Sequence, residues 1–372
     1  MTFVAFLVLV IIFSYLGDEK ISGSVRAVFF RIALIFTLSY MTGMGGDLFT
    51  DHQEYQMMFK NIDKFRIGEI SGLDSIFLEK SDSGGVRAEI GFLCLCKLLS
   101  LLGLSDIGIF FALAIITNTL IVITYYRFKW PPFIFLLFIC NGTFIQEANL
   151  VRQMLAVSIF AFSLKYIECR NLLKYSLCCL IAFAIHRSSM VMLPFFLFFL
   201  KFDDDRYIKL VLAGMWLFSV LVGLRLLSFN IDLFLAISLV SDTYGGFMTD
   251  DPNMGIEKAS FSLIYNFFVA LSFFFYKKES YKIYFYVFIL NGIFQNISVQ
   301  FLNLNRVAYY FEVISPAFIP FLIEHISKHK KIVPIMEVLS LFMIFFYIRL
   351  YIISVETIYL GPNFHQIFEI FR

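Results

Sequence analysis

Long apolar runs of about 20 residues recur along the whole of this 372-residue chain. A helix of that length crosses the ~30 Å hydrocarbon core of a bilayer, and its backbone groups satisfy one another's hydrogen bonds there. Hydrophobic residues make up 60% of the chain and charged residues only 16%, which soluble domains do not reach. The sequence therefore predicts an all-α polytopic membrane protein with about 11–13 hydrophobic helices.

The polar intervals between these runs are short. The two longest, about 45–88 and 229–258, lack the length to bury a core of their own, so we expect them to be external loops. The chain 1–372 is thus predicted to be a single transmembrane domain. Its first run, residues 1–17, has no basic segment before it and no small-residue cleavage site, which indicates an uncleaved first span.

Charge and cysteine usage exclude several classes of partner. The net charge is +2, and the Lys and Arg residues are spread along the chain instead of forming a stripe, so no nucleic acid is expected. The six cysteines lie in apolar runs and lack the paired spacing of a zinc site or a disulfide framework. We expect neither a metal site nor a cofactor.

The basic residues alternate between connections, and this alternation predicts the orientation of the helices. They cluster at 20–31, 127–129, 165–174, 201–209, 276–282 and 324–331. Such clusters mark cytoplasmic connections, so the intervening ones should be external. The alternation leaves room for one span between 88 and 127. We assign it to 107–124, because 87–104 is short and carries Lys97 at its middle. The segment 87–104 is then a re-entrant or interfacial helix on the external side.

With this orientation, the ionisable residues near membrane depth converge on the external leaflet. An ionisable side chain in a span is costly and usually faces a cavity or a partner, so each is a site candidate. The candidates are Glu89, Glu147, Arg152, His186, Arg187 and Arg306.

Arg152 stands at the external start of an apolar helix, where a guanidinium can hold phosphate oxygens in a bidentate manner. A lipid-linked phosphate or pyrophosphate is the ligand that this position favours. The alternative is structural, with Arg152 snorkelling or pairing with Glu147 to close a turn. His186 suits a proton acceptor, although a histidine at a helix end is often only hydrogen-bonded. Glu89 suits a base toward a sugar hydroxyl, or a charge that favours a helix N-terminus.

Further candidates suit hydroxyl-rich ligands. Asp51 and Tyr55 lie four residues apart, on one face of a helix if the segment is helical. Tyr309, near Arg306, suits the wall of a sugar cleft. We place Glu89, His186 and Asp51, in that order, as candidates for the base.

Five short motifs occur in a familiar order, namely DHQEYQMMF from Asp51, EIGF from Glu89, VRQMLAVSIFAF from Val151, IHRSSMVMLP from Ile185 and NRVAYYFE from Asn305. Together they resemble the EpsG-like branch of the Wzy polymerases, over about residues 47–320. The resemblance implies the transfer of a growing glycan from an undecaprenyl pyrophosphate carrier to a sugar hydroxyl of another lipid-linked repeat unit. The positions that match the motifs are Asp51, Tyr55, Glu89, Arg152, His186 and Arg306.

The resemblance also implies a setting. We expect a metal-independent O-antigen or exopolysaccharide polymerase of the bacterial inner membrane, with its site facing the periplasm and a fold resembling GT-C-type membrane glycosyltransferases. A chain-length regulator protein is an expected partner besides the lipid-linked donor and acceptor. Two alternatives remain open, a flippase or other transporter of lipid-linked oligosaccharide, and an O-antigen ligase.

Overall fold

The computed structural model describes residues 3–43, 50–64, 88–199, 205–227, 265–274, 281–300 and 304–326, and the account of the fold refers to these residues. Their regular secondary structure is helical, which confirms the predicted all-α class. The external loop predicted at 229–258 lies outside the described residues. Of the loop at about 45–88, the segment 50–64 and Ala88 are described.

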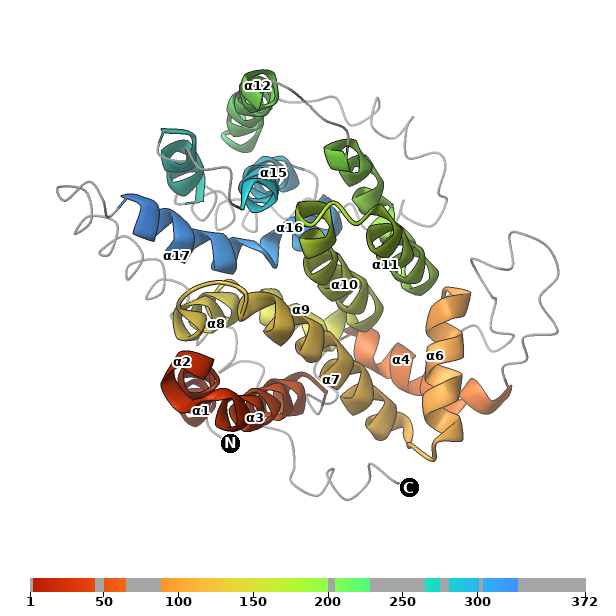
Figure 1. Cartoon of the computed structure of the whole chain (residues 1–372). Helices are drawn as coiled ribbons and strands as arrows, with labels where there is room; N and C mark the ends of the chain where they lie inside the picture. The colour runs from red at the N-terminus through yellow and green to blue at the C-terminus, as the bar shows by residue number, and fades with distance from the viewer. Residues whose placement is uncertain are drawn as a thin grey trace. The chain divides into compact units, whose positions relative to one another are not determined.

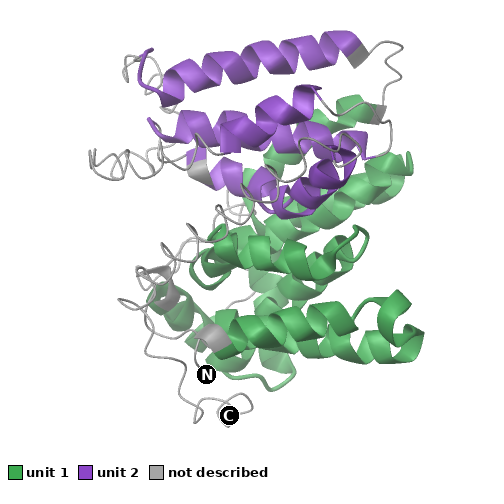
Figure 2. Ribbon diagram, turned by 90° about the vertical axis from the view of Figure 1, so that its left-hand side faces the viewer, with its two compact units in different colours: residues 1–199, 329–372 green, residues 200–328 purple. Residues whose placement is uncertain are grey.

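The chain divides into two compact units, coloured separately in Figure 2. Unit 1 comprises Met1–Phe199 and His329–Arg372, and unit 2 comprises Leu200–Lys328. A division by packing does not test whether both units belong to one membrane domain, so the single-domain assignment stays a prediction.

Unit 1 carries most of the described helices, labelled in Figure 1. They are α1 (Phe3–Leu16), α2 (Glu19–Ser22), α3 (Ser24–Gly43), α4 (Thr50–Lys60), the 3₁₀ helix η2 (Ile62–Lys64), α6 (Ile90–Leu101), α7 (Asp106–Tyr125), α8 (Pro131–Cys140), α9 (Thr143–Asn149), α10 (Val151–Glu168), α11 (Leu172–Ile185) and the 3₁₀ helix η4 (Arg187–Phe199). Unit 2 contains α12 (Asp205–Gly223), a helix over Tyr265–Phe274, α15 (Lys282–Ser298), α16 (Asn305–Glu312) and α17 (Ser315–Ile326).

Three of these helices are long and apolar enough to cross a membrane, or up to five spans exist if each of two bent pairs counts as one. The three are Ser24–Gly43, Asp106–Tyr125 and Arg206–Gly223. The span predicted at 107–124 is therefore confirmed as α7. Helix α6 has 12 residues, which is too short for a span, as expected for a re-entrant or interfacial segment. Helix α1, expected as a first span, has 14 residues. The chain has the helices of a multi-pass membrane protein.

In the described part of each unit, one pair of helices is a broken helix. In unit 1, α8 and α9 meet at 59°, and in unit 2, α16 and α17 meet at 42°. The break between α8 and α9 has a local cause, because Gly142 adopts a left-handed φ of +82° that a helix cannot continue through. The Asn141 side chain then accepts a hydrogen bond from the backbone N–H of Thr143 at 3.0 Å, which satisfies one of the first amides of α9.

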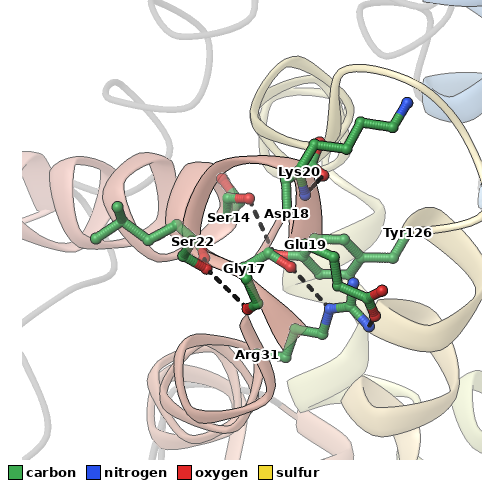
Figure 3. Close-up of polar contacts among 10 residues, drawn as sticks. Ser14, Gly17, Asp18, Glu19, Lys20, Ser22, Arg31 and Tyr126 are labelled. Atoms are coloured by element: carbon green, nitrogen blue, oxygen red, sulfur yellow. Dashed lines mark hydrogen bonds and ion pairs between the residues drawn. The ribbon is translucent and has the colours of Figure 1, made fainter. Parts of the chain in front are cut away.

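Close helix packing brings two predicted cytoplasmic connections together in unit 1 (Figure 3). Arg31 donates to the carbonyl of Gly17 at 2.8 Å, and its guanidinium lies 4.3 Å from the ring centre of Tyr126. The Tyr126 hydroxyl donates in turn to the carbonyl of Ser14 at 3.0 Å. The turn between α1 and α3 is thus fixed against the end of α7.

A third connection joins the same group. Arg127, directly after α7, forms an ion pair of 2.6 Å with Glu168 at the end of α10. The alternation of basic residues predicted that the connections at 20–31, 127–129 and 165–174 lie on one side of the membrane, and these contacts agree with that prediction.

Candidate functional site

The carboxylate of Glu89 is the centre of a buried polar cluster in unit 1. One of its oxygens, Oε2, accepts a hydrogen bond from Arg152 Nη1 at 2.9 Å. The other, Oε1, lies 3.0 Å from Nδ1 of His186 and accepts from the backbone N–H of Arg187, also at 3.0 Å. The Tyr55 hydroxyl accepts from Nε of Arg152 at 3.1 Å. We call Tyr55, Glu89, Arg152, His186 and Arg187 the Glu89 cluster.

The five residues come from four separate segments of the sequence, and all except Tyr55 lie at the ends of helices, which are labelled in Figure 1. Tyr55 lies on α4, Glu89 is the N-cap residue of α6, and Arg152 is in the first turn of α10. His186 ends α11 and Arg187 begins η4. Helix ends carry the backbone amides that have no partner inside the helix, and the amide of Arg187 is used here to hold a carboxylate oxygen.

Gly91 explains how α6 comes close enough to α11 to deliver Glu89. A Cβ atom at Gly91 would lie 2.6 Å from both the Cβ and the carbonyl oxygen of Ala184 on α11. Real Cβ atoms do not approach so closely, so only glycine permits this contact between the helices. Because Glu89 precedes Gly91 by two residues and His186 follows Ala184 by two, the contact sets the distance between the two side chains.

Aromatic rings enclose the cluster on the side of α4. Tyr55 is 4% exposed and its ring centre lies 6.1 Å from that of Phe59 and 6.2 Å from that of Phe92. The Arg152 guanidinium carbon lies 5.5 Å from the centre of the Tyr55 ring and 5.9 Å from that of Phe92. The rings hold the planar cation and reduce its contact with solvent, which strengthens its electrostatic interactions.

Glu89 lies before α6, outside the candidate spans, and its ionisation follows from these contacts. Burial alone raises the pKa of its carboxyl, but the hydrogen bond from His186, the charge of Arg152 and the amide of Arg187 outweigh burial and lower the pKa to about 2. Glu89 is therefore ionised at neutral pH, and a carboxylate held so firmly in its charged form is a weak base.

The structure brings four of the predicted motif residues together, Tyr55, Glu89, Arg152 and His186, and Arg187 with them. The carboxylate partner of Arg152 is Glu89, 63 residues away in the sequence, and not the nearby Glu147. The simplest structural alternative for Arg152, a local pair that closes a turn, is thus not the arrangement found. An ion pair across such a distance could not be read from sequence spacing.

The remaining candidates lie on α4, α9 and α16. Glu147 is buried on α9 and accepts a hydrogen bond from Asn118 on α7, a residue that the sequence analysis did not single out. Arg306 and Tyr309 lie three residues apart on α16 of unit 2. Asp51 is on α4 with Tyr55, and its side chain lies outside the described residues. The sequence does contain one indication that Asn118 is unusual, because it is an amide inside a highly apolar run.

A family model matches residues 26–360, which is most of the chain. It is the model of the EpsG family. The chain belongs to the EpsG family.

This result confirms the resemblance that the five motifs indicate, and it makes the chain a member of a family of Wzy-type polymerase-like membrane proteins. No curated protein and no solved structure matches the chain. The likeness to GT-C-type enzymes is therefore not confirmed. For an EpsG-family protein, a membrane glycan polymerase with a role in polysaccharide biosynthesis is the function that the family suggests.

Among the described residues, no three His, Cys, Asp or Glu side chains gather in a group that could hold a metal ion. The charged site that these residues do form is the Glu89 cluster, in which a cation, an imidazole and a carboxylate meet.

A substitution at Gly91 tests whether the approach of α6 to α11 holds the cluster together. Gly91→Val should lower the melting temperature of the purified protein, because the added side chain forces α6 away from Ala184 and separates Glu89 from His186. The overpacking penalty is typically ~1–3 kcal/mol. The matched control is Gly214→Ala on α12, where an added Cβ meets no atom within 4 Å and little change is expected. Equal melting temperatures for Gly91→Val and wild type would contradict the packing argument.

Proposed function

We propose that this EpsG-family protein is a membrane glycosyltransferase that polymerises oligosaccharide repeat units linked to undecaprenyl pyrophosphate. The observation that supports the proposal best is the Glu89 cluster, because it combines a positioned arginine with a carboxylate-bound histidine in one buried site. Transfer from a pyrophosphate donor to a hydroxyl needs a cation for the leaving group and an acceptor for one proton.

Arg152 is the residue proposed to hold the leaving group. Its orientation is fixed before any ligand arrives, since Tyr55 and Glu89 each accept one of its N–H groups. A preorganised cation in a site of low dielectric stabilises the charge that develops on pyrophosphate without reorganising during the reaction. We propose that it does so without a metal ion, with Arg187 as a further cation for the donor and Asp51 lining the sugar site. The roles expected from the sequence for Arg306 (a cation for the donor) and Tyr309 (the wall of a sugar cleft) stay predictions.

His186 is the residue proposed to accept the proton, in place of Glu89, which the sequence analysis ranked first. Both oxygens of Glu89 already accept hydrogen bonds, and its low pKa makes it a weak base. If Nδ1 of His186 carries the hydrogen and donates it to Glu89, then Nε2 is the nitrogen with a lone pair. Glu89 then acts through His186, as a positioning residue.

The proposed step is a single displacement. The acceptor hydroxyl loses its proton to Nε2 of His186, and its oxygen forms a bond to the anomeric carbon of the donor sugar. The bond from that carbon to the pyrophosphate oxygen breaks, and undecaprenyl pyrophosphate leaves with the electron pair while Arg152 holds it. Direct attack without a covalent intermediate gives inversion at the anomeric carbon.

The proposal extends to the setting of the reaction. The side of the membrane that carries the Glu89 cluster is proposed to be periplasmic, because the connections at the opposite ends of the same helices carry the basic residues. We propose further that the protein lies in the inner membrane of a bacterium. Its acceptor is proposed to be lipid-linked, and a chain-length regulator is its proposed partner. The glycan is an O-antigen or an exopolysaccharide.

One observation favours a second candidate, a transporter of lipid-linked oligosaccharide. Transporters commonly use discontinuous helices in corresponding parts of the molecule, and each unit here has one, α8 with α9 and α16 with α17. A ligase is the third candidate, since it shares the donor chemistry and differs in its acceptor.

Deleting the gene distinguishes these three functions. Gel separation of the surface glycan should show chains reduced to a single repeat unit, because donor supply and attachment persist while polymerisation stops. Loss of all attached chains would indicate a ligase instead, and repeat units trapped on the inner leaflet would indicate a transporter. Either result would overturn the proposed function.

Exchanging one cation for another tests the role of Arg152. Arg152→Lys keeps the charge but loses the planar fork of donors, so we expect polymerisation to fall at least about tenfold at equal membrane abundance. The assay uses purified protein and lipid-linked donor in excess chelator, so that the cation being tested is the arginine. The matched control is Arg127→Lys, another carboxylate-paired arginine, which should keep its activity. Full activity of Arg152→Lys, or activity that only added Mg²⁺ restores, would exclude the proposed role.

Two further variants separate the base from the residue that positions it. His186→Gln should lower the turnover of bound donor by roughly a hundredfold or more while leaving its affinity nearly unchanged, because a base acts only during the attack. Glu89→Gln should retain more turnover than His186→Gln, since the amide still accepts a hydrogen bond from Nδ1. It should also weaken donor binding by disturbing Arg152. The reverse order of turnover would restore Glu89 as the base.

A further inference from the structure

A second buried carboxylate in unit 1 has surroundings unlike those of Glu89. Glu147 lies on α9, is 5% exposed, and accepts a hydrogen bond through Oε2 from the side-chain amide of Asn118 at 3.0 Å. Asn118 is fully buried on α7 and also donates to the carbonyl of Ala114 at 3.0 Å. The same amide nitrogen lies 3.4 Å from the hydroxyl of Ser39 and 3.5 Å from that of Thr42, both on α3.

Each of the two residues in this hydrogen bond has a buried oxygen without a hydrogen-bond partner within the described residues, and so does Thr143 on α9. The three oxygens are Oε1 of Glu147, Oδ1 of Asn118 and Oγ1 of Thr143. Thr143 precedes Glu147 by four residues on α9, so the two side chains lie on the same face of that helix. Buried polar atoms are almost always satisfied, and a group of orphaned acceptors is a sign of a bound water or ion.

The charge of Glu147 decides between these occupants. No cationic side chain forms an ion pair with Glu147 in the part of the chain that the structure describes. An uncompensated carboxylate inside a membrane protein is costly, so a water molecule, which brings no charge, does not suffice. The occupant must carry one positive charge, which leaves a proton or a monovalent metal cation.

We propose that Glu147, Asn118 and Thr143 bind one small monovalent cation, with Na⁺ as the physiological candidate. A proton on Glu147 would bridge only two oxygens, whereas a metal cation takes several oxygen ligands, and we assign it Oε1 of Glu147, Oδ1 of Asn118 and Oγ1 of Thr143. The oxygens are hard ligands with one negative charge in total, so a monovalent ion leaves the site neutral. The hydroxyls of Ser39 and Thr42 lie beside the amide nitrogen of the same Asn118 side chain.

The local backbone agrees with this proposal. Helix α9 is the second half of the broken pair α8 and α9, which is bent by 59° at Asn141 and Gly142. Discontinuous helices are where membrane proteins commonly place cation sites, because the break exposes backbone carbonyls and helix ends to the interior. The ion would join α3, α7 and α9, the helices that carry its ligands. The site shares no residue with the Glu89 cluster, so the proposal does not depend on the proposed function.

Thermal unfolding of the purified full-length protein tests for the ion. The melting temperature should rise with Na⁺ at constant ionic strength, with N-methylglucamine as the replacing cation, and should increase linearly with the logarithm of the Na⁺ concentration above saturation. Glu147→Gln should abolish this dependence and unfold at a temperature insensitive to Na⁺, because the neutral amide removes the charge that attracts the ion. Binding of radioactive ²²Na⁺ to the same samples gives an independent readout.

Two more variants keep the test decisive. Thr143→Ala removes one ligand without changing charge and should raise the half-saturating Na⁺ concentration by roughly three- to tenfold. Glu168→Gln is the matched control, since it neutralises a glutamate paired with Arg127 and should keep the full response to Na⁺. If wild type shows no response specific to Na⁺, or responds only to pH, a proton is the occupant and the proposal is wrong. An unchanged response in Glu147→Gln would also overturn it.

Discussion

The interaction on which unit 1 depends most is the compensation of the Glu89 carboxylate. A carboxylate that is 3% exposed is stable only with several donors, and here Arg152, His186 and the amide of Arg187 supply them from two further segments. Inside a membrane the hydrophobic effect gives helices little reason to associate, so packing and polar contacts must hold them together. The contact of Gly91 with Ala184 provides close packing, and the Glu89 cluster provides polar contacts.

Glu89 and Glu147 are two buried carboxylates whose environments differ. Both are buried in unit 1, yet Glu89 pairs with the cation Arg152, whereas Glu147 accepts from the amide of Asn118 and its Oε1 has no hydrogen-bond partner among the described residues. The contacts of Glu89 orient the neighbouring side chains and compensate the charge of its carboxylate. Glu147 lacks a compensating positive charge among the described residues, which is the condition for binding a cation. Residue type alone made both of them site candidates, and their hydrogen-bond partners distinguish the two carboxylates.

The sequence predicts the helical fold, the span at α7 and the grouping of helix ends, because hydropathy and the distribution of basic residues directly reflect the bilayer. It also predicts Tyr55, Glu89, Arg152 and His186 as members of one site, through the order of their motifs. It cannot predict that Arg152 pairs with Glu89 instead of Glu147, since that choice depends on how α6 approaches α11. The role of Asn118 is hidden for the same reason, because a single amide in a span gives no indication of its partner.

The geometry that makes Glu89 a poor base also orients His186, the proposed base. Donors on both carboxylate oxygens stabilise the charged form of Glu89, so it gains little by taking a proton. The same carboxylate lies 3.0 Å from Nδ1 of His186, so that Nε2 is the nitrogen proposed to accept a proton from a sugar hydroxyl. The carboxylate of Glu89 also fixes the orientation of the His186 ring, so Nε2 is already the available nitrogen when the reaction begins. One ion-paired carboxylate therefore orients both the cation proposed to hold the leaving group and the base proposed to activate the acceptor.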